Sequence, residues 1–579
     1  MKASENSFGF MKNESIIEMP FFQRAYVWGK DEWEQLFDDL LDSFNNNKTH
    51  FLGSIILKQL NTNAGEGSRR SVIDGQQRLT TFSILIKSLY DKIPDDEKPD
   101  YNEYLFGKPI KDKNPKIKHS KINSNSFVKV LKATNSPTEK SDDKILECYR
   151  YFCSRVVKLG NFRGFMEFIL DSKLWVVINL EKDEDEQKIF DSINSTGVKL
   201  TATDIIKNAL FAKAIELKTD YETLYKNYWE NTFEGKNIDF WDSEVTTGRL
   251  KRTQSEIFLH AFAIVNGFFD AEIPLEKLSS CYKDKIKDFN KDTIETFLQE
   301  LKQYADIYFK FPKIVFGGNE KQATSFSFDD YELRLFHILK VADVNTIMPL
   351  LLKLKSLYGK DENILKECYE ILEVFVINCY VSNATTKDYN KLFAKMTLEL
   401  DTANPTDSIK KHLQERVTTP LPNRLQIGNS LKSVSKKLDN KRAKLVLFWI
   451  ELFRRHKNLN DIKELSYKYE LEHLMPQKWE ENWKEIGKDK DNAEKLIFQI
   501  GNMTLLNSSL NAGISNAKWE IKLNGDGSRK NCISKCSDLL ITRNDIIDKT
   551  EWNETEIENR TKYLIGDFFK IWDIDKLNA

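Results

Sequence analysis

Two short stretches near residue 500 carry side chains that could transfer a proton and bind a metal ion. The stretch ELEHLMP contains Glu472 directly before His473, and the later stretch GNMTLLNSSLN places Asn502 and Asn511 nine residues apart. Histidine can take a proton from water near neutral pH, and carboxylate and amide oxygens are ligands for hard divalent cations. These residue types are those that metal-assisted hydrolysis needs.

The order of these residues is that of the ββα-metal, or HNH, arrangement, with a histidine on a strand, an asparagine in a loop and a polar residue on the next helix. The offset between Asn502 and Asn511 equals the one in HNH sequences of the form N-L-x-x-L-C-x-x-C-N. Two differences stand out. Asn507 and Leu510 replace the zinc-binding cysteines, so we expect no zinc knuckle, and Glu472 stands where many HNH enzymes have aspartate.

A competing interpretation is that the histidine is structural. A buried histidine taken alone is more often a core residue than a catalyst. The joint spacing of His473, Pro476, Asn502 and Asn511 is harder to meet by chance and favours the catalytic interpretation.

A second group of polar residues lies in SVIDGQQRLTT. Asp74 and Gly75 are predicted to end a strand, and Arg78 to lie in the first turn of a helix. The start of a helix favours anions, and an arginine fork can bind phosphate in a bidentate manner. The alternative is an ordinary turn after a strand, which a lone D-G-x-x-R more often is. The P-loop pattern G-x-x-x-x-G-K-[ST] does not occur in the sequence, so any nucleotide would be held without it.

The elements that position these residues can be predicted from their periodicity. We expect a hairpin from strands at 51–60 and 69–74, a helix from Arg78 onward, and a buried strand at 173–180. The acidic stretch EKDEDEQ is predicted to open a further helix. Thr201 with Asp204 forms a capping-box start to the next one.

Both groups of residues resemble the GmrSD family of modification-dependent restriction enzymes. The N-terminal resemblance rests on FFQRAYVW, FLGSIIL, VIDGQQRLTT and FDSINSTGVKLTATDIIKN, in that order over about 200 residues. The C-terminal one rests on LEHLMPQKW and IGNMTLLNSSLNAGISNAKWEIK, within about 130 residues.

The resemblance implies a ParB-like or sulfiredoxin-like N-terminal fold that binds and hydrolyses a nucleoside triphosphate. By position, the implied nucleotide-binding residues are Gln23, Arg24, Asp74, Gly75, Gln76, Gln77 and Arg78, with Asp74 and Arg78 also serving hydrolysis. Asn194, Thr196 and Lys207 are either further contacts or parts of a helix–Gly–helix corner.

For the C-terminal part, the resemblance implies a nuclease. His473 is the expected general base, Asn502 the residue that orients it, and Glu472 and Asn511 the ligands of Mg²⁺ or another divalent metal. Asn516 and Lys518 are expected near the DNA phosphate.

Composition sets the outer bounds. A chain of 579 residues exceeds one hydrophobic core, and we expect an α+β domain at 1–215, a helical connector at 216–440 and a ββα-metal nuclease domain at 441–579. A formal charge of −1 gives the chain no overall positive field, so we expect any contact with DNA to be made by local basic patches. The basic residues around 441–457 either contact DNA or belong to a solvated helix.

Seven scattered cysteines favour a reduced, cytoplasmic protein without a zinc site. No signal peptide or apolar run of membrane-spanning length is evident, so no membrane association is expected. Homo-oligomer formation is left open.

The sequence therefore predicts a nucleotide-regulated, metal-dependent DNA endonuclease of anti-phage defence. The resemblance implies modified phage DNA as its target, such as DNA with glucosylated hydroxymethylcytosine. Two alternatives remain: a modification sensor that acts by binding alone, and a toxin-like nuclease that cleaves non-specifically on infection.

Overall fold

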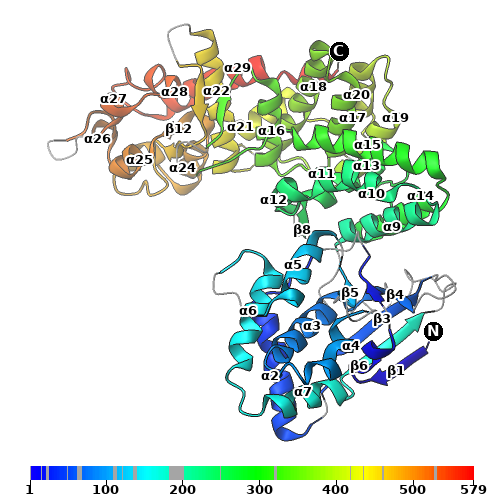
Figure 1. Cartoon of the computed structure of the whole chain (residues 1–579). Coiled ribbons are helices and arrows are strands. Elements are labelled where there is room, and N and C mark those ends of the chain that lie inside the picture. Colours follow the sequence, from blue (N-terminus) through cyan, green and yellow to red (C-terminus); the bar gives the residue numbers. More distant parts are fainter. Residues whose placement is uncertain are drawn as a thin grey trace. The chain divides into compact units, whose positions relative to one another are not determined.

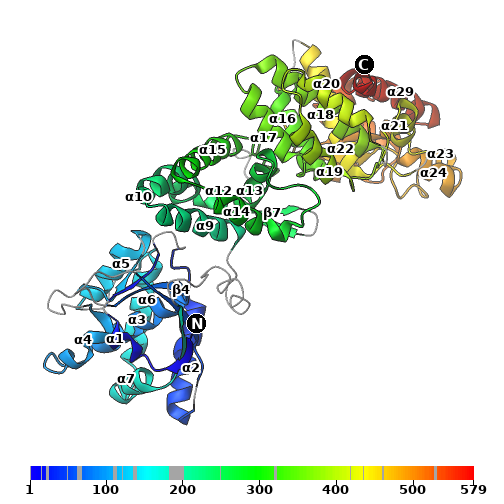
Figure 2. The ribbon, with the colours of Figure 1, turned by 90° about the vertical axis from the view of Figure 1, so that its right-hand side faces the viewer.

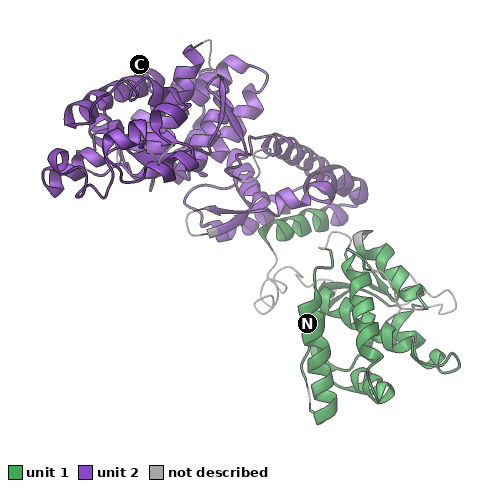
Figure 3. Cartoon of the chain, turned by 90° about the vertical axis from the view of Figure 1, so that its left-hand side faces the viewer, with its two compact units in different colours: residues 1–213 green, residues 214–579 purple. Residues whose placement is uncertain are grey.

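The computed structural model divides into two compact units, residues 1–213 and residues 214–579 (Figure 3). It describes the whole chain except residues 1, 15, 21–24, 49, 61–67, 108–113, 120, 135–139, 181–200, 248–249, 318–322, 417–418, 435, 459–461, 527–530 and 579. The protein is mostly helical with a small mixed sheet. The segments 216–440 and 441–579 fall within one unit, and the three-domain division stays a prediction.

The first unit is built on a six-stranded sheet. Its strand order is β1 (Lys2–Asn6), β6 (Trp175–Leu180), β3 (Gly53–Gln59), β4 (Arg69–Asp74), β2 (Ile16–Glu18) and β5 (Ile117–Lys118). The β1–β6 and β3–β4 pairs are antiparallel, and the other three pairs are parallel. The predicted hairpin and the predicted strand near residue 175 are confirmed. The ParB-like or sulfiredoxin-like assignment stays a prediction.

Helices of the first unit gather on one side of this sheet (Figure 1). They include α2 (Lys30–Asn46), α3 (Gln76–Tyr90), α5 (Lys121–Lys132), α6 (Lys144–Val156) and α7 (Phe162–Asp171), with the shorter α1 (Phe10–Asn13) and α4 (Asn102–Leu105). Strand β3 shows why the sheet has two apolar faces. Ile55 and Leu57 join the main core, whereas Ile56 joins a small cluster with Ile178 and Leu180, because successive strand residues point to opposite faces.

Helix α9 (Ala202–Glu216) begins at the predicted capping box. The Asp204 amide donates to Thr201 Oγ1 at 3.1 Å, and the Thr201 amide donates to Asp204 Oδ2 at 3.3 Å. The helix predicted from EKDEDEQ, together with Asn194 and Thr196, lies outside the described residues.

The first part of the second unit is helical (Figure 2). Its helices are α10 (Tyr221–Leu224), α11 (Asn231–Phe233), α12 (Ile238–Trp241), α13 (Gln254–Val265), α14 (Leu278–Lys287), α15 (Lys291–Phe309), α16 (Tyr331–Ala342), α17 (Met348–Tyr358), α18 (Glu362–Val381), α19 (Tyr389–Glu399), α20 (Pro405–Gln414) and α21 (Arg424–Leu431). Strands β7 (Glu244–Thr247) and β8 (Leu250–Thr253) form an antiparallel pair before α13.

Helix α22 (Asn440–Lys457) links this helical part to the remainder of the unit. It is buried along most of its length and packs against α16, β11 (Glu470–His473), β12 (Met503–Leu506), α28 (Leu540–Arg543) and α29 (Glu554–Ile571). The elements between are α23 (Lys484–Gly487), α24 (Lys490–Ile497), α25 (Ser508–Ile514), α26 (Trp519–Asn524) and α27 (Ile533–Cys536). Helix α22 thus belongs to the cores on both sides of it.

Two contacts show how tightly the parts of the second unit are joined. Glu451 of α22 is fully buried and accepts the backbone N–H groups of Leu540 and Ile541 at 2.9 and 2.8 Å, which caps α28. Trp572, after α29, returns to α18, where its indole N–H donates to Glu373 at 2.6 Å.

Two further long-range pairings complete the unit. Strand β10 (Glu464–Ser466) pairs with β9 (Ser325–Ser327). The Gln414 amide donates to the carbonyl of Leu577 at 2.6 Å. No helix in the described part of the chain is both long enough and apolar enough to cross a membrane.

Candidate active site

Strands β11 and β12, the turn before β12 and helix α25 carry the predicted nuclease residues. The strands pair antiparallel, with His473 opposite Met503, and α25 follows β12 after one residue. That residue, Asn507, caps α25 by accepting the Leu510 amide at 2.8 Å. The position where HNH sequences carry a zinc cysteine therefore starts the helix here.

His473 is buried, and its ring is held in one orientation. Its Nδ1 lies 3.0 Å from the carbonyl oxygen of Ile497, which can only accept, so Nδ1 carries the proton of the neutral ring. Burial lowers the pKa of His473, which keeps the ring neutral at neutral pH. Nε2 lies 3.4 Å from Gln477 Nε2, an amide that can donate to it, and 3.1 Å from Asn440 Oδ1, an acceptor that forms a hydrogen bond with Nε2 only when the ring is protonated. The unprotonated Nε2 is the atom that can accept a proton.

Asn502 is fully buried and makes four hydrogen bonds. Its Oδ1 accepts from the Met475 amide at 2.8 Å and from the Trp552 indole at 3.0 Å. Its Nδ2 donates to the carbonyls of Met475 and Ile497, at 2.9 and 3.1 Å. Asn502 does not touch the imidazole; it fixes the backbone after His473 and shares the Ile497 carbonyl with it.

Glu472 lies on the other face of β11 from His473, because adjacent strand residues alternate. Its Oε1 is 2.5 Å from Nζ of Lys522, a fully buried lysine that also donates to the His473 carbonyl at 3.1 Å. Burial raises the pKa of Glu472 and lowers the pKa of Lys522, and the ion pair opposes both shifts. Glu472 is thus already neutralised by a cation of the protein.

Asn511 lies beside Glu470 rather than Glu472. Its Nδ2 donates to Glu470 Oε2 at 3.0 Å, while its buried Oδ1 has no hydrogen-bond partner among the described residues. Glu470 shares a strand face with Glu472, two residues away, so alternation could have identified it from the sequence. Within the described ranges, no group of three or more His, Cys, Asp or Glu residues is arranged as a metal site.

A divalent metal is nevertheless compatible with this donor set. Mg²⁺ is commonly held by one or two protein oxygens, with water and substrate phosphate completing its shell. Glu470 and the unsatisfied Oδ1 of Asn511 provide such oxygens. Glu472 would have to leave Lys522 to join them.

Buried Arg560 of α29 supports the same segment and was not predicted from the sequence. It donates to the carbonyls of Gly501 and Met503, both at 2.6 Å, on either side of Asn502. Burial lowers its pKa to about 10. No local pattern marks this residue, because Gly501 and Met503 are more than 50 positions away along the chain.

Two arginines of the basic stretch 441–457, for which DNA contact is one of the two interpretations given above, are engaged internally on α22. Arg454 pairs with Asp545 and Asp567 at 2.8 and 2.9 Å, and buried Arg455 pairs with Glu451 at 2.6 Å. These ion pairs join α22 to its neighbours. The structure therefore contradicts the use of these two side chains as a DNA-contacting patch.

In the first unit, Arg78 and Asp74 meet at the start of α3. Arg78 Nη2 donates to the Ser54 carbonyl at 2.8 Å and to Asp74 Oδ2 at 3.1 Å. Its Nε is buried without a hydrogen-bond partner among the described residues. Gly75 has φ +95°, and a Cβ there would lie 3.1 Å from the Ser54 carbonyl oxygen, so this turn requires glycine.

Gln77 has a structural role beside its predicted one. Its Oε1 accepts the Val27 amide at 2.9 Å, and its Nε2 donates to the Ala25 carbonyl at 3.3 Å. The segment after residue 24 is thereby fastened to α3. Gln76 is also buried. Gln23 and Arg24 lie outside the described residues.

Comparison with known proteins gives two matches to one family. Residues 7–211 match the family model of the N-terminal domain of the GmrSD restriction endonuclease. Residues 424–567 match the family model of the C-terminal domain of GmrSD restriction endonucleases. The uncharacterized protein MJ0686 of Methanocaldococcus jannaschii is 25% identical over 255 residues. That similarity covers 37% of this chain and 42% of the relative.

Proposed function

Because the chain belongs to the GmrSD family of restriction endonucleases, we propose that it is a divalent-metal-dependent DNA endonuclease regulated by a nucleoside triphosphate. Its proposed targets are modified phage DNAs, as in type IV restriction. The observation that carries the proposal is His473, buried and neutral, with Nδ1 bound to a carbonyl and Nε2 left to accept a proton.

In this mechanism His473 Nε2 takes a proton from water while the water oxygen attacks phosphorus and the bond from phosphorus to the leaving oxygen breaks. Loss of a general base typically costs about 10²–10⁴-fold in rate. Asn502 and Arg560 hold the backbone on which this histidine is mounted. A divalent metal would stabilise negative charge on the phosphate and leaving oxygen. The residues proposed to hold it, Glu470 and Asn511, lie on the face of β11 opposite His473.

We propose that the first unit binds the triphosphate at the start of α3. Arg78 supports this role, since its buried Nε lacks a partner among the described residues and can bind a phosphate oxygen. With phosphate bound to Arg78, the Asp74 carboxylate would no longer pair with that arginine and would bind magnesium or orient water for hydrolysis. Gln77 keeps the adjacent segment in place.

A cleavage assay tests the nuclease. The full chain is incubated with modified and unmodified phage DNA, with and without Mg²⁺ and triphosphate, beside His473→Ala and the control His456→Ala, which changes an exposed histidine. We expect cleavage of modified DNA that needs metal and is lost only in His473→Ala. Full cleavage by His473→Ala rules out the assignment. Equal cleavage of both DNAs favours the toxin-like alternative, and binding without cleavage by the unaltered chain favours the sensor.

A further inference from the structure

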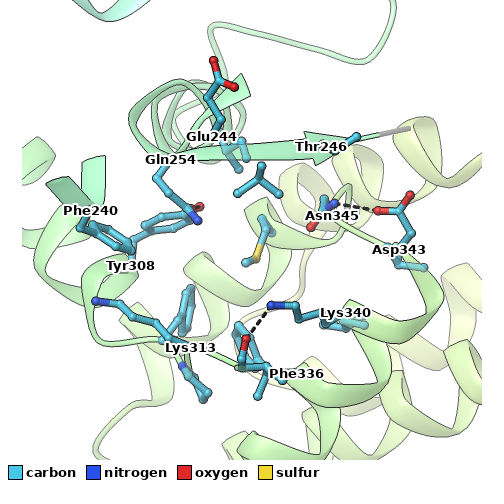
Figure 4. Close-up of a pocket in the computed structure, with 18 residues that line it drawn as sticks. Phe240, Glu244, Thr246, Gln254, Tyr308, Lys313, Phe336, Lys340, Asp343 and Asn345 are labelled. Atoms are coloured by element: carbon cyan, nitrogen blue, oxygen red, sulfur yellow. Dashed lines mark hydrogen bonds between the residues drawn. The ribbon is translucent and has the colours of Figure 1, made fainter. Parts of the chain in front are cut away.

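A cavity of about 490 Å³ lies in the helical part of the second unit (Figure 4). It is partly open to solvent, and its lining residues come from α12, β7, α13, the end of α15, the segment after it, α16 and the start of α17. All its lining residues fall between 240 and 348, outside both regions matched by the family. Its volume is within the ~300–1,000 Å³ of sites that hold small organic ligands.

Aromatic rings form much of its wall. Phe240, Tyr308, Phe311 and Phe336 line the cavity, and Met348 lies among them. Aromatic faces of this kind stack against planar ligands, nucleobases among them.

Two lysines without carboxylate partners also line the cavity. Lys313 Nζ lies 4.0 Å from the ring centroids of both Phe240 and Phe309, and Lys340 Nζ donates to the Ile314 carbonyl at 2.5 Å. Among the described residues, neither lysine is paired with a carboxylate: the contacts of Lys313 Nζ are aromatic rings, and the contact of Lys340 Nζ is a backbone carbonyl. Burial lowers the pKa of both. An anion in the cavity would compensate their positive charge.

The acidic residues of the cavity are engaged elsewhere. Glu244 pairs with exposed Lys251 at 3.3 Å and in Figure 4 points away from the other lining side chains. Asp343 accepts from the Asn345 amide at 3.3 Å at the edge of the cavity. The interior therefore presents cations and donors rather than carboxylates.

Gln254 adds a donor with a fixed orientation. Fully buried Tyr308 donates its hydroxyl to Gln254 Oε1 at 2.7 Å, and burial raises the pKa of Tyr308, so the hydroxyl keeps its proton. With Oε1 occupied, the Nε2 group is left to donate. The cavity thus combines aromatic faces, two ammonium groups and an amide donor.

We propose that this cavity binds a mononucleotide unit, with its base against the aromatic rings and its phosphate against Lys313 and Lys340. The unit can come from a free nucleotide or from an unpaired nucleotide of a DNA strand, which present the same chemistry. Charge-assisted hydrogen bonds suit phosphate oxygens, and the amide donor suits a base carbonyl. This site is separate from the triphosphate site of the first unit and does not depend on it.

Calorimetric titration of the full chain carrying two substitutions tests the proposal. Arg78→Ala removes the proposed triphosphate contact in the first unit, and His473→Ala prevents cleavage of the DNA probe. The probes, in the presence of a chelator, are the four deoxynucleoside monophosphates, the matching nucleosides, inorganic phosphate and a single-stranded oligonucleotide. The variants are Lys313→Met, which keeps the apolar stem, and Val245→Trp, which fills the cavity from its rim. Lys310→Met, on an exposed lysine, is the control.

We expect at least one monophosphate to bind more tightly than its nucleoside and than phosphate alone. Lys313→Met should weaken binding about tenfold or more, Val245→Trp should abolish it, and Lys310→Met should leave it unchanged. Tighter binding of the oligonucleotide, lost in the same variants, identifies a DNA strand as the source. The proposal is overturned if no monophosphate or oligonucleotide binds at millimolar concentration, or if Lys313→Met and Val245→Trp bind as the parent does.

Discussion

At the scale of single residues, strand alternation separates two neighbours that the sequence places together. Glu472 and His473 are adjacent in the chain, yet one faces Lys522 and the other faces Ile497. Asn511 meets Glu470 instead. The histidine and the two asparagines could be found from their spacing, whereas the choice between the two glutamates depends on which strand face α25 covers.

This placement gives a prediction about the metal. Glu470→Gln and Asn511→Ala should each raise the Mg²⁺ concentration needed for half-maximal cleavage, because each removes a proposed oxygen ligand. Asn507→Ala, which loses only a helix cap of about 0.5–2 kcal/mol, is the matched control. A magnesium titration of cleavage rate measures this. If Glu472→Gln raises the Mg²⁺ concentration for half-maximal cleavage more than Glu470→Gln does, the metal ligand is Glu472 rather than Glu470.

A second prediction concerns His337, which is fully buried among aromatic rings with neither ring nitrogen bonded to a described residue. Burial lowers its pKa to about 3, with the charges of Lys444 and Lys340 adding to the shift. Below pH 6.5 the unfolded chain binds a proton here that the folded chain does not. This histidine should therefore cost stability as pH falls, by ~1.4 kcal/mol per pH unit between about pH 6.5 and 3.

His337→Phe should remove this dependence. The free energy of unfolding of the variant minus that of the parent should be ~2 kcal/mol larger at pH 5 than at pH 8. Urea titrations at both pH values measure the change, with exposed His456→Gln as the control. The same pH dependence in His337→Phe as in the parent would contradict a neutral buried histidine.

At the scale of elements, buried charges hold the second unit together. Glu451 accepts from Arg455 and caps α28 through two backbone N–H groups. Replacing this carboxylate leaves a buried guanidinium without its partner, which typically costs 3–5 kcal/mol.

Glu451→Gln should therefore lower the unfolding free energy of the second unit by roughly 3 kcal/mol. Glu415→Gln, at an exposed pair with Lys411, should change it by less than about 1 kcal/mol. Denaturant titration followed by tryptophan fluorescence compares the two. Equal, small effects would mean that α28 does not need this cap.

Local elements of the fold could be predicted, and distant pairings could not. The β3–β4 hairpin, β6 and the capping box of α9 follow from alternation, turns and side-chain spacing within a few residues. Strand β1, with the polar sequence KASEN, forms by pairing with β6 about 170 positions away. Likewise β9 pairs with β10 across nearly 140 positions. Such strands are specified by their partners, and no local signal announces them.

At the scale of the whole molecule, the proposed function places nucleotide binding in one unit and DNA cleavage in the other. Arg78→Ala should weaken triphosphate binding by ~1.5–3 kcal/mol, and Asp74→Ala should reduce hydrolysis more than binding. If the triphosphate licenses cleavage, both variants should also lose cleavage of modified DNA although His473 is intact.

Calorimetry and a phosphate-release assay on the full chain measure these effects. Arg163→Ala, at an exposed pair with Glu97 in the same unit, is the control. Unchanged triphosphate binding and turnover in both Arg78→Ala and Asp74→Ala would reduce the D-G-Q-Q-R stretch to a structural turn.

The return of residues 572–577 to the helical part has a consequence for biosynthesis. Trp572 supplies the N–H that Glu373 of α18 accepts, and Leu577 supplies the carbonyl to which Gln414 donates. These partners are translated about 160–200 codons apart. While the ribosome is still translating β11, the strand that carries His473, α18 therefore lacks its contact with Trp572. Translation that stalls before codon 572 leaves Glu373 with Arg334 as a donor but without the indole N–H of Trp572.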